Sequence, residues 1–128
     1  NPATPRHVAC RDCHNVHRLT ASEPWKGVSG YTREMIRGRE ATKEYEVCYK
    51  CHTDSANLPF GASNLRLLFD PANPSYHPVE AAGRNTDVPS LIRTMSVHDT
   101  IRCSDCHGND DPFGPQGPHA SAYSPILK

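Results

Sequence analysis

The chain has 128 residues, with 14 Lys and Arg against 14 Asp and Glu, and 36% of its residues are hydrophobic. A formal net charge of zero lacks the excess of Lys and Arg that marks a nucleic-acid-binding protein, and no apolar run approaches the roughly 20 residues that a membrane-spanning helix needs. Because 12 Pro and 8 Gly interrupt the sequence, we expect mostly irregular structure with a few short α-helices and little or no β-sheet.

Residues 1–24 are bounded by prolines and hold the first cysteine pair, Cys10-Arg-Asp-Cys13-His14. The chain opens on Asn-Pro-Ala-Thr-Pro without a signal peptide. We therefore expect the mature form of an exported protein, from which the export signal has been removed.

The best-supported helix has Ser29 as its cap. It covers residues 32–46, which are rich in Arg, Glu and Lys, with an interruption at Gly38. Its later part, residues 40–52, is predicted to carry the second cysteine pair, Cys48-Tyr-Lys-Cys51-His52.

From residue 53 onward the sequence predicts short pieces and loops. The apolar stretches 65–69 and 90–93 stand beside prolines. The third cysteine pair, Cys103-Ser-Asp-Cys106-His107, comes next, and Gly, Pro and Asp punctuate residues 108–128, where no helix is expected. We interpret residues 1–128 as one domain whose two ends are extended segments that can contact neighbouring subunits.

All six cysteines fall in C-x-x-C pairs, and a histidine follows every pair directly. The pattern C-x-x-C-H attaches a c-type haem, since two thiols bond to the porphyrin edge and the next imidazole binds the iron. A zinc site would use two pairs and leave the third pair and the adjacent histidines unexplained, and no βαβ pattern supports a thioredoxin-like pair. We therefore predict three covalently attached haem c groups. The thiols are those of Cys10, Cys13, Cys48, Cys51, Cys103 and Cys106, and the proximal iron ligands are His14, His52 and His107.

Five histidines remain for the second axial position of three irons, so every haem can be bis-histidine. The favoured distal ligands are His17, His77 and His119. His17 follows His14 too closely to hold the other face of the same porphyrin, Pro78 holds His77 in an extended conformation, and His119 lies in a Gly- and Pro-rich tail. Either His7 or His98 can replace one of these three ligands.

Methionine ligation has little support, because Met35 and Met95 lie among apolar neighbours, as space-filling methionines do. Three porphyrins would supply the apolar centre that the side chains lack, so we expect a haem-cored fold and a largely unfolded apoprotein. With two propionates on each haem, the formal charge falls from zero to about −3 in the ferric state and about −6 in the ferrous state.

Several segments resemble those of a known family. Cys10-Arg-Asp-Cys13-His14-Asn-Val-His17 resembles the opening C-x-x-C-H-x-x-H of extracellular multihaem cytochromes that polymerise into conductive filaments. Tyr76-His77-Pro78-Val79, Cys103-Ser-Asp-Cys106-His107-Gly108 and Gly117-Pro118-His119-Ala120-Ser121 are similar to the F-H-P-V, C-x-D-C-H-G and G-P-H-G-S signatures of exported multihaem c-type cytochromes. Ala120 stands where the last signature usually has Gly.

The resemblance implies identical subunits joined head to tail, with His17 ligating a haem of the adjacent subunit. It further implies an extracellular or cell-surface location, and electron transfer to other redox proteins or extracellular acceptors. The alternative is a soluble periplasmic triple-haem electron carrier whose ligands are all intramolecular. An enzyme needs an iron with an open face, and the surplus of histidines argues against that.

Overall fold

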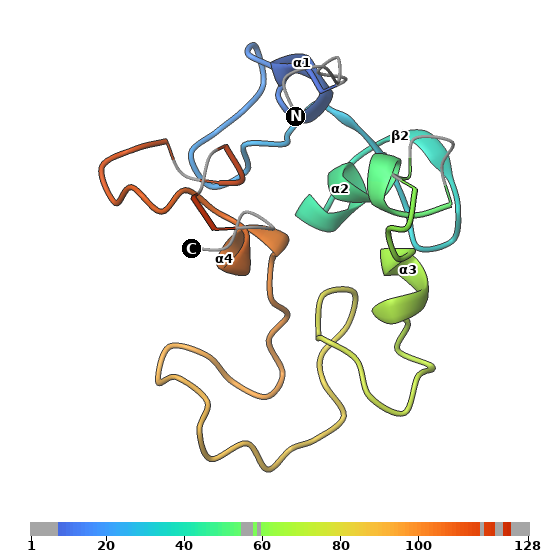
Figure 1. Ribbon diagram of the computed structural model, residues 1–128, viewed down its shortest axis with the longest axis vertical. Coiled ribbons are helices and arrows are strands. Elements are labelled where there is room, and N and C mark those ends of the chain that lie inside the picture. Colours follow the sequence, from blue (N-terminus) through green and yellow to red (C-terminus); the bar gives the residue numbers. More distant parts are fainter. Residues whose placement is uncertain (1–7, 55–57, 59, 116, 120–121, 124–128) are drawn as a thin grey trace. The chain divides into compact units, whose positions relative to one another are not determined.

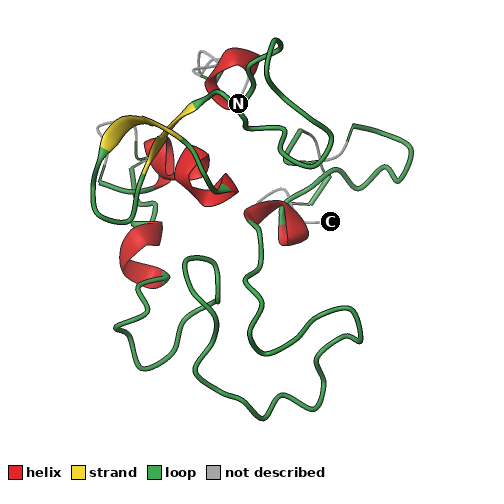
Figure 2. Cartoon of the chain, turned by 180° about the vertical axis from the view of Figure 1, so that it is seen from behind, coloured by secondary structure: helices red, strands yellow, loops and turns green. Residues whose placement is uncertain are grey.

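The computed structural model describes residues 8–54, 58, 60–115, 117–119 and 122–123. Loops connect its short elements and make up most of the described chain (Figures 1 and 2). The expectation of irregular structure with a few short helices and little β-sheet is thus confirmed. In chain order the elements are α1 (Cys10–Cys13), β1 (Ser29–Tyr31), β2 (Arg37–Glu40), α2 (Glu44–His52), α3 (Leu65–Leu68) and α4 (Cys103–Cys106).

Two compact units divide the chain, Asn1–Leu67 and Leu68–Lys128. The first unit contains α1, the two strands and α2, and with them the first two cysteine pairs. The second contains α4 and the third pair. We describe each unit by itself.

The prediction of a helix over residues 32–46 is wrong. The first part of this range belongs to an antiparallel hairpin formed by β1 and β2. Strands β1 and β2 pair Ser29 with Glu40 and Tyr31 with Arg37, with an irregularity between the two pairs. Gly38 has a φ of +79°, a conformation that a right-handed helix excludes. The charged run also lacks an apolar stripe, so a helix there would have no face to bury.

Helix α2 begins at Glu44, four residues after the start predicted for the segment that carries the second pair. The carboxylate of Glu46 sets this start, since its Oε2 accepts hydrogen bonds from the backbone N–H groups of Thr42, at 2.6 Å, and Lys43, at 3.2 Å. At the other end the hydroxyl of the fully buried Thr53 donates to the carbonyl of Tyr49 at 2.6 Å. The second C-x-x-C-H therefore forms the C-terminal part of a capped helix.

Helix α2 packs against β1 to form the core of the first unit. A Cβ atom on Gly30 would lie 2.9 Å from the Cβ of Glu46 and 3.1 Å from that of Ala41, so strand and helix approach as closely as a glycine allows. Beside this contact lies a cluster of buried side chains: Trp25, Val28, Ala41 and Val47. Part of the interior is thus filled by side chains.

The second unit relies on loops held by backbone hydrogen bonds. Val79 is its only large hydrophobic residue that is buried among the described residues. The N–H of Ile101 donates to the carbonyl of Pro78 at 2.9 Å, and the hydroxyl of Tyr76 donates to the carbonyl of Ala82 at 2.6 Å. The described part of 108–128 contains no helix, as expected. Nowhere in the described ranges is a helix long and apolar enough to cross a membrane.

Candidate haem-attachment sites

The first and third cysteine pairs form the same local structure. In α1 and in α4 the two cysteines begin and end a single helical turn. The histidine that follows leaves the helix with extended backbone, and its N–H donates to the carbonyl of the first cysteine at 2.8 Å, from His14 to Cys10 and from His107 to Cys103. Each turn thus fixes the backbone that joins two thiols to one imidazole.

An aspartate between the cysteines closes each of these turns. The Oδ2 of Asp12 accepts a hydrogen bond from the N–H of Ala9, and the Oδ2 of Asp105 accepts one from the N–H of Arg102, both at 2.7 Å. The carboxylate accepts a hydrogen bond from the residue before the helix, whose backbone N–H has no partner within the helix. Sequence reasoning missed this role, although the aspartate stands at the same position of both motifs and that repetition could have indicated it.

The second pair lies on a longer helix and needs no such aspartate. Lys50 occupies the position of Asp12 and Asp105, and the turn is part of the nine-residue α2. The thiol of Cys48 donates to the carbonyl of Glu44 at 3.7 Å. The exposed His52 is the last residue of the helix.

The imidazole of His14 is held in an orientation suited to binding a metal. Its Nδ1 lies 2.9 Å from the carbonyl oxygen of Pro24. A carbonyl oxygen can only accept, so Nδ1 carries the proton, and Nε2 then has the lone pair that an iron needs. Histidine ligands in proteins usually donate their other ring N–H in this way.

The first two pairs lie side by side in the first unit. The ammonium group of Lys50 donates to the carbonyl of Asp12. Partial burial raises the pKa of the Cys13 thiol, which is otherwise exposed, and the neighbouring Asp12 and Cys51 add to this rise while Lys50 opposes it. The hydrogen bond from Lys50 to Asp12 places both motifs in one neighbourhood.

A hollow of about 400 Å³ opens beside His14. Its lining includes the exposed Val16 as apolar surface, Arg11 and Lys50 as cations and Asp12 as an anion. A porphyrin presents an apolar plate with two propionates at one edge, so this mixture of side chains suits it. The residues of the first motif therefore fit a haem.

The predicted distal ligands lie on the surface. His17, His77, His98 and His119 are all exposed, whereas His7 lies outside the described residues. Two of the exposed histidines border three-residue turns centred on proline: the N–H of Val79 donates to the carbonyl of His77, and the N–H of His119 donates to the carbonyl of Gly117, both at 2.8 Å. The ring of His77 contacts that of Phe69, with the ring centroids 6.1 Å apart.

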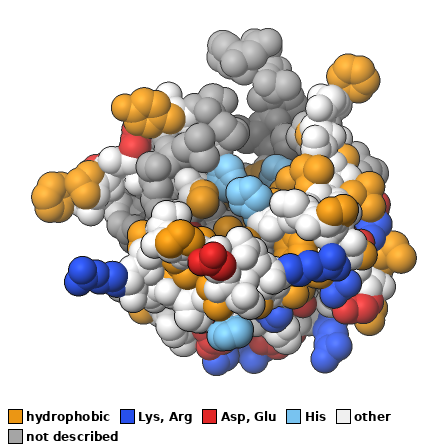
Figure 3. Space-filling model, turned by 90° about the horizontal axis from the view of Figure 1, so that it is seen from below, with side chains coloured by type: hydrophobic (Ala, Val, Ile, Leu, Met, Phe, Trp, Pro, Cys, Tyr) orange, Lys and Arg blue, Asp and Glu red, His pale blue; other side chains and the backbone are white. Residues whose placement is uncertain are grey.

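Apolar side chains also reach the surface of the described chain, as Figure 3 shows for one face. Phe113 and Val16 expose 96% and 77% of their area, and Ile92 exposes 63%. In the described ranges no three His, Cys, Asp or Glu side chains gather as candidate ligands of one metal ion, and no disulfide joins any two of the six cysteines.

Two long-range contacts of the site were also missed by sequence reasoning. The hydrogen bond between His14 and Pro24 joins residues 10 positions apart, and the bond between Lys50 and Asp12 joins residues 38 positions apart. No local sequence pattern predicts either contact. Comparison with family models, with curated proteins and with solved structures finds no match. The functional argument therefore depends on the residues themselves.

Proposed function

We propose that this chain is a multihaem c-type cytochrome with three covalently attached haem c groups around which its loops fold, and that it transfers electrons without catalysing a reaction. The observation that carries the proposal is that every cysteine belongs to a C-x-x-C-H motif. The similar turns of α1 and α4 support it, because two segments far apart in the sequence each present two thiols and a histidine from one helical turn.

Bound haem supplies an iron that takes up and releases one electron. The protein's part is to hold it: the cysteines form the thioether bonds, and His14, His52 and His107 bind the iron from one side. Arg11 and Lys50 beside the first motif offer positive charge to propionates. A second histidine bound to each iron would leave no site for a substrate, which is the reason for proposing a carrier.

The haem assignment is tested by the mass of the intact protein produced in a host with a haem-attachment system. Three haems should be bound, and changing both cysteines of one motif to serine should remove one haem. Changing Ser22 and Ser29 to alanine provides a control that should keep all three. A wild-type chain that carries zinc, or disulfides in place of haem, would contradict the assignment.

We further propose that the chain is the repeating subunit of an extracellular or cell-surface conductive filament. Its support is the resemblance of the first motif together with the exposed position of His17, which would suit binding to the iron of an adjacent subunit. A head-to-tail contact that does not close into a ring builds an open filament.

Electron microscopy of the native, haem-loaded protein tests the filament. His17→Ala should abolish filaments and leave one haem per subunit with an altered spectrum, whereas Ser22→Ala should do neither. Filaments that persist with unchanged spectra in His17→Ala would overturn this role. A wild-type protein that stays monomeric would indicate the soluble periplasmic carrier instead.

A further inference from the structure

The backbone of the loop that bears His17 is fixed by a turn. The N–H groups of Arg18 and Leu19 donate to the carbonyl of Asn15 at 3.0 and 2.9 Å, and the N–H of His17 donates to the side-chain oxygen of Asn15 at 3.1 Å. His17 and the neighbouring Val16 remain exposed. The turn therefore orders the main chain while the imidazole stays at the surface.

Gly27 forms the floor beneath this loop. The side-chain amide of Asn15 donates to the carbonyl of Gly27 at 3.2 Å. Gly27 has a φ of +81°, and a Cβ atom there would lie 2.9 Å from both Cβ and Cδ of Arg18 and 3.0 Å from the Asn15 amide nitrogen. Both the conformation and the close approach require a glycine.

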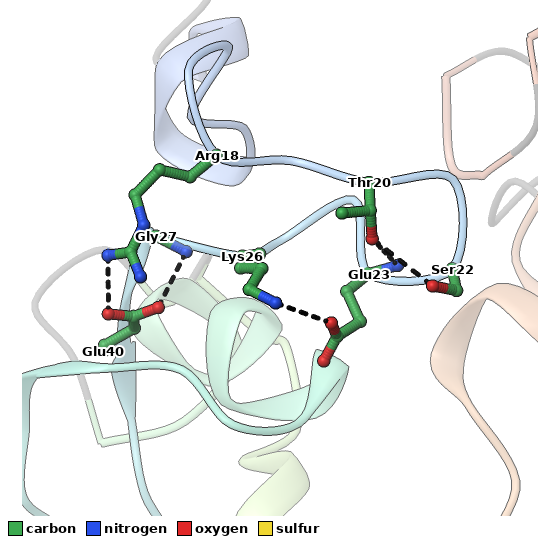
Figure 4. Close-up of polar contacts among 7 residues, drawn as sticks. All are labelled: Arg18, Thr20, Ser22, Glu23, Lys26, Gly27 and Glu40. Atoms are coloured by element: carbon green, nitrogen blue, oxygen red, sulfur yellow. Dashed lines mark hydrogen bonds and ion pairs between the residues drawn. The ribbon is translucent and has the colours of Figure 1, made fainter.

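Glu40 joins the loop to its floor. One carboxylate oxygen accepts from the Gly27 N–H at 3.1 Å and the other accepts from the Arg18 guanidinium at 2.8 Å (Figure 4). Glu40 ends β2, whose pairing with β1 connects it to the core of the first unit. The loop is thus anchored at the residue directly after His17.

We propose that Glu40 is a positioning residue for His17: through Arg18 and Gly27 it holds the loop in the orientation that presents the imidazole to the haem iron of a second copy of this chain. This inference rests on the filament proposed above and names the contact on which assembly depends. The ion pair is exposed, with 52% and 45% of the two side chains accessible, so it adds little to the stability of the unit. Its loss should therefore alter orientation while the fold remains.

The chain supplies a matched control on the same segment. Lys26 donates to Glu23 at 3.2 Å, and the N–H of Glu23 donates to the hydroxyl of Thr20 at 3.0 Å (Figure 4). This second ion pair has similar exposure, 44% and 46%, but neither of its side chains is hydrogen-bonded to Arg18 or Gly27. Glu23→Gln removes a comparable charge from the adjacent turn without touching the anchor of His17.

The test compares haem-loaded wild type, Glu40→Gln, Glu23→Gln and Gly27→Ala. Glu40→Gln should raise the subunit concentration needed for filaments by about threefold, as the loss of one exposed ion pair allows. Gly27→Ala should raise this concentration by roughly tenfold or more, because the alanine both strains the backbone at residue 27, where φ is positive, and displaces the side chain of Arg18. In both variants part of one haem signal should change from low spin to high spin, and the amides of Arg18 and Leu19 should exchange hydrogen faster. Glu23→Gln should match the wild type.

The outcomes are distinct. Faster exchange at Arg18 and Leu19 with wild-type assembly and an unchanged haem spectrum would show that the loop is loosened without effect on His17, and would overturn the inference. Equal changes in Glu40→Gln and Glu23→Gln would also overturn it, since they would reflect only lost charge. A wild type that binds three haems but never assembles would overturn the filament and this inference together.

Discussion

Lys50 donates a hydrogen bond from its ammonium group to the backbone carbonyl of Asp12, and this contact joins the second cysteine pair to the first across 38 residues. Asp12 and Lys50 each lie between the two cysteines of their own motif, so the bond holds the two motifs together where haem attachment would occur. Lys50 is half-buried, which strengthens such a contact relative to one in water.

Lys50→Met should lower the free energy of unfolding of the haem-loaded protein by about 1 kcal/mol, because the donor is lost while a side chain of similar length remains. Chemical denaturation followed at the haem absorption measures this change. Lys26→Met is the control, since its exposed pair with Glu23 should contribute at most about 0.5 kcal/mol. Equal stability of Lys50→Met and the wild type would mean that the link between the motifs has no energetic role.

Asp105→Ala should weaken the α4 turn by about 1 kcal/mol, because the N–H of Arg102 loses its acceptor. The share of protein that carries only two haems should rise, which intact mass spectrometry measures. Asp99→Ala is the control. It removes a similar hydrogen bond, from the Ser96 N–H at 2.7 Å, that lies outside any cysteine motif, so the number of bound haems should not change. If both variants retain three haems fully, the aspartate is not needed for attachment.

Pro24→Gly should raise the reduction potential of the haem attached at the first motif. A looser backbone weakens the hydrogen bond from the Nδ1–H of His14, which makes the imidazole a poorer electron donor to ferric iron. Loss of part of a bond worth about 1 kcal/mol corresponds to roughly 20–40 mV for one electron. Spectroscopic redox titration checks this, with Pro89→Gly as the control. A fall in the potential would contradict this effect of the hydrogen bond between His14 and the Pro24 carbonyl.

Removal of haem should leave the chain largely unfolded, and the second unit should lose protection entirely. Among its described residues Val79 is the only large hydrophobic residue that is buried, so little apolar burial opposes the chain entropy. Hydrogen exchange of protein made without haem attachment measures this by segment, and fluorescence of Trp25, the single tryptophan, reports on the first unit. A cooperative, native-like unfolding transition in that protein would contradict the prediction.

The sequence alone predicted those features that depend on near neighbours. The C-x-x-C-H spacing needs only one helical turn, and Pro and Gly limit the helices wherever they fall, so the motifs and the loop-rich architecture could be recognised without a fold. The helix over residues 32–46 was misread because its Arg, Glu and Lys favour a helix locally, whereas residues 37–40 pair with β1, the strand that packs against α2. Gly38 marked the break but did not reveal a hairpin.

Only the tertiary structure decided which groups meet. The carbonyl of Pro24 that orients His14 and the carboxylate of Glu40 that anchors the loop of His17 lie 10 to 22 residues from their partners. Such contacts depend on how the hairpin returns the chain to the first motif, and many sequences with the same local pattern would return it elsewhere. The residues proposed to bind haem thus lie in short motifs, while the orientation of His14 and the anchoring of the His17 loop follow from the packing of segments that the motifs do not specify.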